Sequence, residues 1–242
     1  DIYGALNDDG SVKTVGFMEY ETDIADRLTG EGGISEAIFS LVPGIEIQSQ
    51  GRITIEDTLD FTGFTEAGDA SAVVSFKAAG DIDVNGSLVD HPTLNERNNS
   101  DLMMNTAIQT TSYSFTAGAS FSVGENPLNP IVFSSDPFAT DQGIGDLNFA
   151  DQVMVYTEGG NINFASGNTT TIGQLDFESE DYMTLIGMHY NLASYTGDIR
   201  GRTGGNMEVK GVIQTATGNI DLTVGKSVQL IRQRYSNGDY YI

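Results

Sequence analysis

The sequence of 242 residues contains no cysteine and only two histidines, His91 and His189. Without thiolates the chain has no disulfide framework, no cysteine-ligated zinc and no cysteine nucleophile. The two histidines lie in unrelated segments and do not form an H-x-x-x-H pair, so they do not indicate a zinc site either. No stretch approaches the roughly 18 consecutive apolar residues of a membrane helix. We therefore expect no membrane insertion.

Basic residues are also scarce, with 11 Lys and Arg against 34 Asp and Glu, which gives a formal net charge of −23. Binding to nucleic acid or to anionic lipid requires a basic face, so we expect no nucleic-acid partner. A strongly acidic surface keeps a protein soluble by self-repulsion. Clustered carboxylates can also bind Ca²⁺, which prefers oxygen ligands, and Ca²⁺ is the one cofactor that the composition suggests.

Two pairs of aspartates are weak metal candidates. Asp81 and Asp83 alternate along an expected strand and would point outward together. Asp8 and Asp9 lie in a turn-like segment that contains only a fragment of the calcium-loop pattern. Because the complete pattern is absent, neither pair defines a calcium site by itself.

Motifs of catalysis are missing as well. The sequence has no G-x-S-x-G, no G-x-G-x-x-G after a strand and no complete phosphate-binding loop, so we expect no catalytic residues. One alternative stays open, because Asp81 and Asp83 could act as acid and base on a sugar. A polysaccharide lyase or hydrolase is therefore the rival interpretation.

Glycine is abundant, with 29 glycines against five prolines, and one phrase containing it recurs. "AAGDIDVNGSLVD" (78–90) returns as "EGGNINFASGN" (158–168), "YTGDIRG" (195–201) and "ATGNIDLTVG" (216–225). Apolar residues alternate with period two inside each phrase, which indicates short strands, and glycine suits the corners between them. In a β-helix each coil stacks on an equivalent coil, so the same positions repeat. The sequence predicts an all-β chain forming a parallel β-helix, with a β-sandwich as the alternative.

Two sets of stacked residues follow from this prediction. The first consists of isoleucines that form inward stacks, Ile82, Ile162, Ile199 and Ile220. The second consists of corner asparagines that hydrogen-bond along the stack, Asn85, Asn161 and Asn219.

The domain organisation follows from the same pattern. Residues 1–40 lack the repeated phrase and are expected to form an N-terminal cap or lead-in. Residues 41–242 are expected to form the β-helix, with insertions near 90–111 and 125–145. The C-terminal "LIRQRYSNGDYYI" is either a last coil or a docking edge for another subunit, because Tyr and Arg are enriched at protein interfaces. The candidate contact residues are Arg232, Arg234, Tyr235, Tyr240 and Tyr241.

Four phrases in fixed order carry a resemblance to a family. They are "LVPGIEIQSQGRITIEDTLDF", "VVSFKAAGDIDVNGSLVD", "SYSFTAGASF" and "TATGNIDLTVGKSVQL". Together they cover roughly residues 41–124 and 195–235, and they resemble a module of large bacterial exoproteins of the filamentous haemagglutinin type. The Asn-Pro-Asn motif of the secretion domain in such proteins is absent, since "ENPLNP" differs from it. The resemblance is therefore to an interior module.

The resemblance implies a right-handed β-helix that is secreted through an outer-membrane transporter and works at the cell surface. We expect a non-enzymatic extracellular protein, either an adhesin for a host or surface ligand or a self-associating subunit of a filament or biofilm matrix. The alternatives are the polysaccharide-active enzyme and a β-sandwich subunit of a pilus or surface layer.

Overall fold

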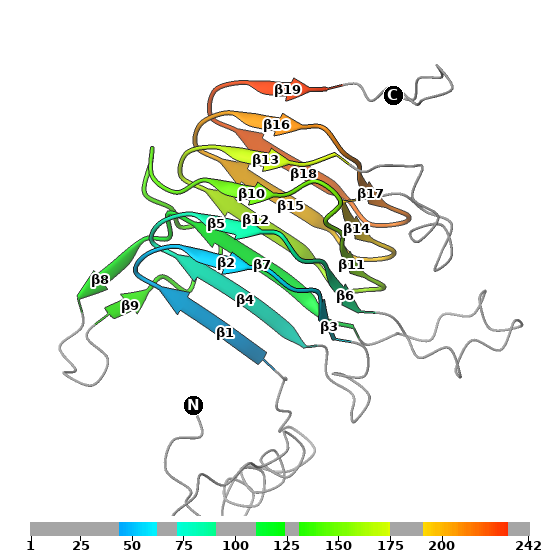
Figure 1. Cartoon of the computed structure of the whole chain (residues 1–242), viewed down its shortest axis with the longest axis horizontal. Coiled ribbons are helices and arrows are strands. Elements are labelled where there is room, and N and C mark those ends of the chain that lie inside the picture. Colours follow the sequence, from blue (N-terminus) through cyan, green and yellow to red (C-terminus); the bar gives the residue numbers. More distant parts are fainter. Residues whose placement is uncertain (1–43, 62–71, 91–109, 124–130, 175–190, 232–242) are drawn as a thin grey trace, which may run out of the picture. The chain divides into compact units, whose positions relative to one another are not determined.

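The computed structural model describes residues 44–61, 72–90, 110–123, 131–174 and 191–231, so the lead-in expected over residues 1–40 lies outside the described residues. Three parallel sheets dominate these ranges (Figure 1). The first sheet contains β1 (Gly44–Ser49), β4 (Val73–Ala78), β7 (Ser112–Ala117), β12 (Ile162–Ser166), β15 (Ile199–Thr203) and β18 (Ile220–Val224).

The second sheet contains β2 (Ile53–Ile55), β5 (Ile82–Val84), β10 (Leu147–Phe149), β13 (Thr170–Ile172), β16 (Met207–Val209) and β19 (Val228–Leu230). The third sheet contains β3 (Leu59–Asp60), β6 (Leu88–Asp90), β11 (Val155–Thr157), β14 (Leu192–Ser194) and β17 (Ile213–Thr215). A separate antiparallel pair is formed by β8 (Phe121–Val123) and β9 (Ile131–Phe133).

The chain visits the three sheets in turn and then returns to the first, so each circuit is one coil. The strands of successive coils pair in parallel within each sheet, whereas a sandwich of hairpins would pair them antiparallel. The prediction of a parallel β-helix is therefore confirmed, and the β-sandwich alternative is wrong. Among the residues that the structure places, no membrane-spanning helix is found.

The shortest described coil has 21 residues, which is the separation of Asp198 from Asn219 and of Asn206 from Ser227. The same interval joins Ile199 to Ile220 and Met207 to Val228. Other coils keep the same register but are longer. The coil that runs from Val73 to its partner Ser112 is nearly twice the length of the shortest one. The extra residues of that coil are inserted in the sequence between β6 and β7, and the strands stay aligned.

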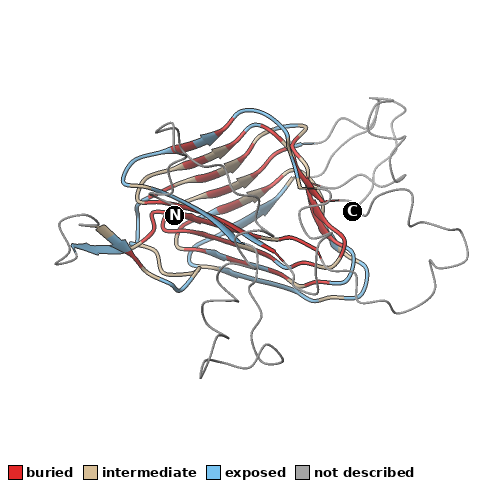
Figure 2. Ribbon diagram, turned by 90° about the horizontal axis from the view of Figure 1, so that it is seen from below, coloured by how far each residue is buried: buried red, intermediate tan, exposed pale blue. Residues whose placement is uncertain are grey.

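Aromatic and aliphatic side chains fill the inside of the coils. Figure 2 shows buried residues along strands of the stack. The rings of Phe76 and Phe115 stack with centroids 5.4 Å apart, and Phe149 meets Phe115 edge-on at 5.3 Å. Such aromatic pairs add to the stabilisation that burial provides. Gly201 lies in the same column, where the Phe164 ring occupies the space that a Cβ on Gly201 would need.

The predicted isoleucines occupy two inward stacks. Ile162, Ile199 and Ile220 occupy the same position in successive strands of the first sheet. Ile82 belongs to a separate stack in the second sheet, where it lies between Ile53 and Leu147. A polar corner residue followed by alternating inward side chains suits a strand of either sheet, so the phrase does not specify the sheet.

The chain leaves the stack between β7 and β10, where an insertion was expected near 125–145. Two glycines with positive φ, Gly118 and Gly145, form the neck of this excursion. A Cβ on Gly145 would overlap the backbone of Gly118, so only glycine lets the two backbones approach so closely. The excursion contains β8 and β9 (Figure 1).

The same excursion covers the outer face of the first sheet. The buried Lys77 donates from Nζ to the Ser134 carbonyl at 2.9 Å, and its ammonium pairs with Glu46 at 3.0 Å. Further along, the Arg202 guanidinium lies 4.6 Å from the ring centroid of Phe138, within cation–π range. The hairpin segment is therefore fastened to the stack at several points.

The insertion expected near 90–111 has a different neck. Asp90 is buried and accepts a hydrogen bond from the backbone N–H of Thr111 at 2.5 Å. Equivalent positions in later coils carry Thr157, Ser194 and Thr215. Residues 91–109 between the two ends lie outside the described residues.

Replacing Phe115 by alanine should lower the free energy of unfolding by about 3–5 kcal/mol, because its ring is fully buried between other rings. Chemical denaturation measures this loss. Phe121→Ala is the matched control, since that ring is 42% exposed on β8 and its loss should cost much less. Equal losses for both variants would contradict the described core.

Excision of residues 92–109 should leave the coils intact, because it returns that coil to the length of the shortest one and joins the chain beside the Asp90–Thr111 contact. Shorter loops also cost less closure entropy. Circular dichroism and thermal melting should show an unchanged cooperative transition. Deletion of residues 112–117, which form β7, is the control that should abolish it. An excised protein without a transition would refute the assigned coil length.

Candidate functional site

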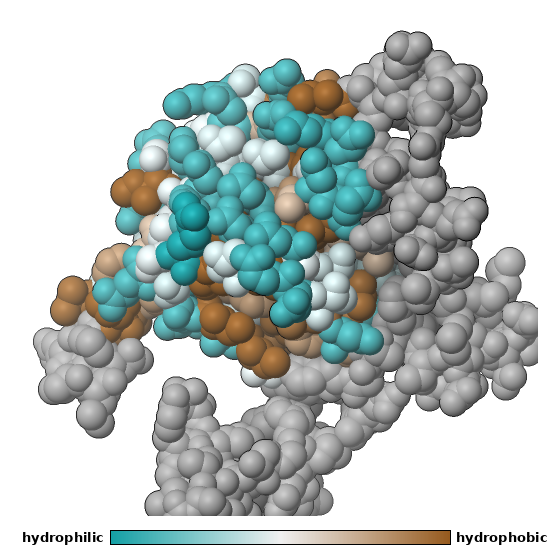
Figure 3. Space-filling view, in the orientation of Figure 1, coloured by the Kyte–Doolittle hydropathy of each residue, from teal (hydrophilic) through white to brown (hydrophobic). Residues whose placement is uncertain are grey.

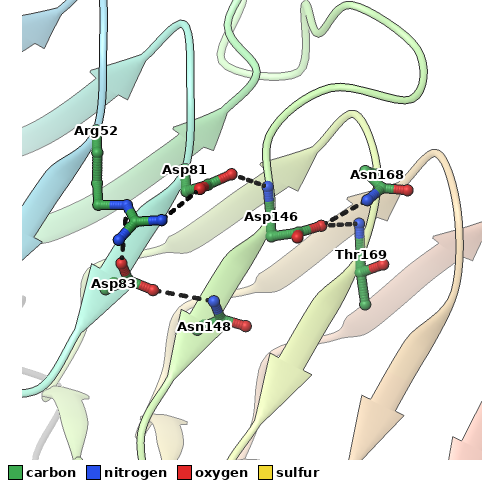
Figure 4. A network of polar contacts seen from close by, with 7 residues as sticks. All are labelled: Arg52, Asp81, Asp83, Asp146, Asn148, Asn168 and Thr169. Carbon is green, nitrogen blue, oxygen red and sulfur yellow. Dashed lines mark hydrogen bonds and ion pairs between the residues drawn. The ribbon is translucent and has the colours of Figure 1, made fainter.

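A chain of polar side chains runs across the outer face of the second sheet and its corner (Figure 4). We call it the polar ladder, and its members come from four successive coils. They are Arg52, Asp81, Asp83, Asp146, Asn148, Asn168 and Thr169.

The predicted pair Asp81 and Asp83 lies within this ladder. Both side chains point outward, as the alternation along β5 requires (Figure 4). One guanidinium bridges them, because Arg52 Nη2 lies 2.9 Å from Asp81 Oδ2 and Nε lies 3.3 Å from Asp83 Oδ2. The two carboxylates are thus brought together, with a cation already between them.

The other oxygens of the pair accept hydrogen bonds from the following coil. The backbone N–H of Asp146 donates to Asp81 Oδ1 at 3.0 Å, and Asn148 Nδ2 donates to Asp83 Oδ1 at 2.9 Å. Asp146 repeats the arrangement one coil higher, where its Oδ1 accepts from Asn168 Nδ2 at 2.7 Å and from the Thr169 N–H at 3.0 Å. Every oxygen of Asp81 and Asp83 therefore has a partner within the protein.

These contacts set the electrostatics of the ladder. The pKa of Asp81 is lowered, first by the hydrogen bond from the Asp146 backbone and then by that from Arg52. The same pairing raises the pKa of Arg52. A general acid of a glycosidase needs a raised pKa to stay protonated near neutrality, and Asp81 has the opposite shift. In this geometry Asp81 and Asp83 connect their own coil to the coils before and after it.

A second ladder runs along the corner that precedes the first sheet, and we call it the corner ladder. Its members are Ser112, Asn161, Asp198 and Asn219. In each step a side-chain oxygen accepts the backbone N–H of the equivalent residue one coil later. Ser112 Oγ accepts from Asn161 at 3.0 Å, Asn161 Oδ1 from Asp198 at 2.9 Å, and Asp198 Oδ1 from Asn219 at 2.9 Å.

The corner ladder confirms the predicted role of Asn161 and Asn219. Asn85 also bonds along the stack, because its Nδ2 donates to Oε2 of Glu56, the equivalent residue of the preceding coil, at 3.2 Å. It does so at another corner, directly after β5 of the second sheet, so it is not a member of the corner ladder.

Several candidate residues cannot be placed. Asp8, Asp9, His91 and His189 lie outside the described residues. The predicted contact residues Arg232, Arg234, Tyr235, Tyr240 and Tyr241 lie outside them too. Within the ranges that the structure does describe, no group of three or more His, Cys, Asp or Glu side chains is arranged to hold a metal ion.

Sequence reasoning did not find Arg52 or Asp146 as partners of Asp81. Arg52 precedes Asp81 by 29 residues, and Asp146 follows it by 65 residues. Insertions make these separations unequal, so no constant spacing marks the contacts. The usable signal is a polar residue directly before each short apolar strand, which Arg52, Asp81 and Asp146 share.

The last described strands present apolar side chains to solvent. Ile220 is 45% exposed, Val228 53% and Leu230 76%, whereas Ile199, one coil earlier, is fully buried. Together with Leu222 these residues form what we call the C-terminal edge. Hydrophilic side chains cover much of the described surface shown in Figure 3, with further apolar patches between them. Exposed apolar residues also lie on β1 and β8, among them Ile47 at 43% and Val123 at 78%. The edge therefore consists of interior positions without a described coil above them.

Comparison of the chain with protein-family models, with curated proteins and with solved structures found no match in any of the three.

Removing Asp198 should destabilise the protein in a pH-dependent way. Its pKa is lowered, mainly by hydrogen bonds from the Asn219 backbone and side chain. Folding therefore favours the ionised carboxylate, and its contribution is present above the unfolded-state pKa, about 4, and is lost as pH falls through the lower folded value. The stability difference between the native protein and Asp198→Ala should be largest near pH 7 and shrink below about pH 4.

Urea denaturation from about pH 7 to about pH 2.5, which spans the titration of a carboxyl group, measures this difference. Asp221→Ala is the matched control, because it removes one negative charge from the adjacent strand β18. A difference between native protein and Asp198→Ala that stays constant over the whole range would contradict the role assigned to the Asp198–Asn219 contact.

Proposed function

We propose that the chain is a secreted, non-enzymatic protein of the bacterial cell surface that acts as an adhesin. The observation that carries the proposal is the polar ladder, whose carboxylates are bonded to the protein itself. Charged groups on the outer wall are used to hold coils together, and Asp81 in particular has a pKa shifted away from that of a general acid. The outer face of the second sheet therefore has the features of a structural scaffold and lacks those of a sugar-cleaving groove.

The insertions supply the places where such a scaffold can bind. The coil from Val73 to Ser112 and the coil from Ile162 to Ile199 are both much longer than the coil from Ile199 to Ile220. Binding residues are concentrated on loops that a rigid framework positions. We assign ligand contact to these corner insertions, with a component of a host cell or another surface as the ligand.

The resemblance to exoproteins of the filamentous haemagglutinin type supports the same proposal. It implies export through an outer-membrane transporter and an extracellular location. The absence of cysteine and the net charge of −23 are compatible with this environment. A bound Ca²⁺ is part of the proposal only at the acidic residues 8 and 9, because the guanidinium of Arg52 already lies between Asp81 and Asp83 and offsets one of their two charges.

Self-association into a filament or matrix is the second candidate function. The C-terminal edge favours it, because an unpaired strand with exposed apolar residues recruits another strand. Analytical ultracentrifugation over a range of protein and salt concentrations tests it, since growth through that edge should give oligomers that increase with concentration.

Adhesion is tested by coupling the protein to beads at defined density and mixing them with erythrocytes and with epithelial cells. Multivalent display should give agglutination or bead binding, because many weak contacts act together. The variant lacking residues 92–109 is the matched control, which should keep the coils and lose part of the binding. Failure of the native protein to bind either cell type would count against an adhesin.

The enzymatic alternative is tested on acidic and neutral polysaccharides, with product detection by reducing-end and unsaturated-uronate assays. We expect no cleavage. Cleavage that is lost in Asp81→Ala and Asp83→Ala would overturn the non-enzymatic proposal and identify the two carboxylates as a catalytic pair.

A further inference from the structure

The strand β18 at the C-terminal edge is built like an interior strand. Its inward positions carry Ile220 and Leu222, which are 45% and 37% exposed. Within the described residues β18 pairs with β15 on one side, and its other side is not paired with any described strand. Because an open strand edge exposes both apolar side chains and backbone hydrogen-bonding groups, it requires a cover.

The corner ladder shows what geometry the cover must have. Each side chain of the ladder accepts the N–H of the equivalent residue in the following coil, and Asn219 is its last described member. Asn219 uses its Nδ2 to donate to Asp198 at 3.1 Å. Its Oδ1 is the group that would accept the N–H of a residue in a seventh coil. A covering strand should therefore begin with a corner residue placed above Asn219.

The C-terminal residues of the sequence have the required pattern. Residues 238–242 read Gly-Asp-Tyr-Tyr-Ile, and the phrases that open β18 and β15 read Gly-Asn-Ile-Asp-Leu from 218 and Gly-Asp-Ile-Arg-Gly from 197. All three place an Asx residue after glycine and an apolar residue next. The tail thus repeats the phrase with which strands of the first sheet begin.

A second observation comes from the corner before these phrases. The hydroxyls of Ser194 and Thr215 each accept the N–H of the next glycine, at 2.8 and 3.0 Å. Each also donates to the glycine carbonyl of the preceding coil, Ser194 to Gly160 and Thr215 to Gly197. Ser236 follows Thr215 by the same interval of 21 residues at which Thr215 follows Ser194. It precedes Gly238 by two residues, whereas Ser194 and Thr215 precede their glycines by three, so the corner in the tail is one residue shorter and the phrase after it follows its counterpart in β18 one residue earlier than in the shortest coil.

We propose that residues 239–242 of the same chain pair in parallel with β18 and form the first strand of a seventh coil. Tyr240 then lies over Ile220, Ile242 lies over Leu222, and the Asp239 N–H donates to the Asn219 side chain. This is independent of the proposed adhesin function, and it competes with self-association through the C-terminal edge, because it assigns that edge to the chain's own tail. It also moves Tyr240 from a contact between subunits to a contact within one chain.

The absence of cysteine makes the proposal directly testable by paired cysteine substitution. Adjacent strands lie about 4.8 Å apart, within the Cα separation of about 4.4–6.8 Å that a disulfide spans. Ile220→Cys combined with Tyr240→Cys should form an intramolecular disulfide in high yield under mild oxidation. Ile220→Cys combined with Tyr241→Cys is the matched control, because residue 241 faces the opposite side, and its yield should be several-fold lower.

Non-reducing electrophoresis and intact mass distinguish the outcomes. A monomer that has lost two hydrogens supports the proposal. A disulfide-linked dimer would mean that a second copy covers the edge, and the absence of any cross-link would mean that the tail does not reach β18. Either result overturns the proposal, and neither depends on whether the protein binds cells.

Hydrogen exchange on chains without cysteine substitutions gives an independent readout. The amides of Ile220–Val224 should exchange more slowly in the full chain than in a chain that ends at Asn237. Exchange in β4 and β7 should be the same in both, which shows that the truncated chain is folded. Equal exchange of β18 in the two chains would overturn the proposal.

Discussion

Backbone hydrogen bonding between equivalent residues of successive coils is the constraint on which the rest of the structure depends. It keeps the strands of all three parallel sheets aligned, and this alignment is what brings like residues together. Inside the coils, phenylalanine rings of successive coils stack on each other. At the outer corners, polar residues of successive coils hydrogen-bond to each other. Each coil contacts mainly its neighbours, so the interior is a sequence of similar local packings, as in other repeat architectures.

The same alignment determines what the charged residues do. A polar residue directly before a strand recurs above and below itself, so its oxygen can accept the N–H of its counterpart. Asp81, Asp146 and Asp198 all use a carboxylate oxygen in this way. Only some of the 34 acidic residues are used so. For Asp81 and Asp198, the hydrogen bonds that hold the coils together also lower the pKa, because an anion with fixed donors resists protonation.

Much of the fold could be predicted from the sequence, because inward residues recur with period two and glycines mark the corners. The number of sheets and the register could not be predicted, because insertions of different length separate equivalent residues. Among the described strands of the first sheet, equivalent residues are separated by the shortest interval only between the last two coils, as from Ile199 to Ile220. For this reason the sequence did not show that Ile82 and Asn85 belong to the second sheet and the corner after it. Of the candidate site, the pairing of Asp81 with Asp83 was predicted, whereas Arg52 was not, since its contact joins two coils.

The buried Asp90 has a consequence for the segment that follows it. It occupies the corner position that Thr157, Ser194 and Thr215 fill in later coils, and its carboxylate accepts the Thr111 N–H although the two residues are 21 positions apart. The contact fixes both ends of the intervening segment beside the third sheet. A change in the length of that segment then alters mainly the entropy of closing the loop, which grows only slowly with length.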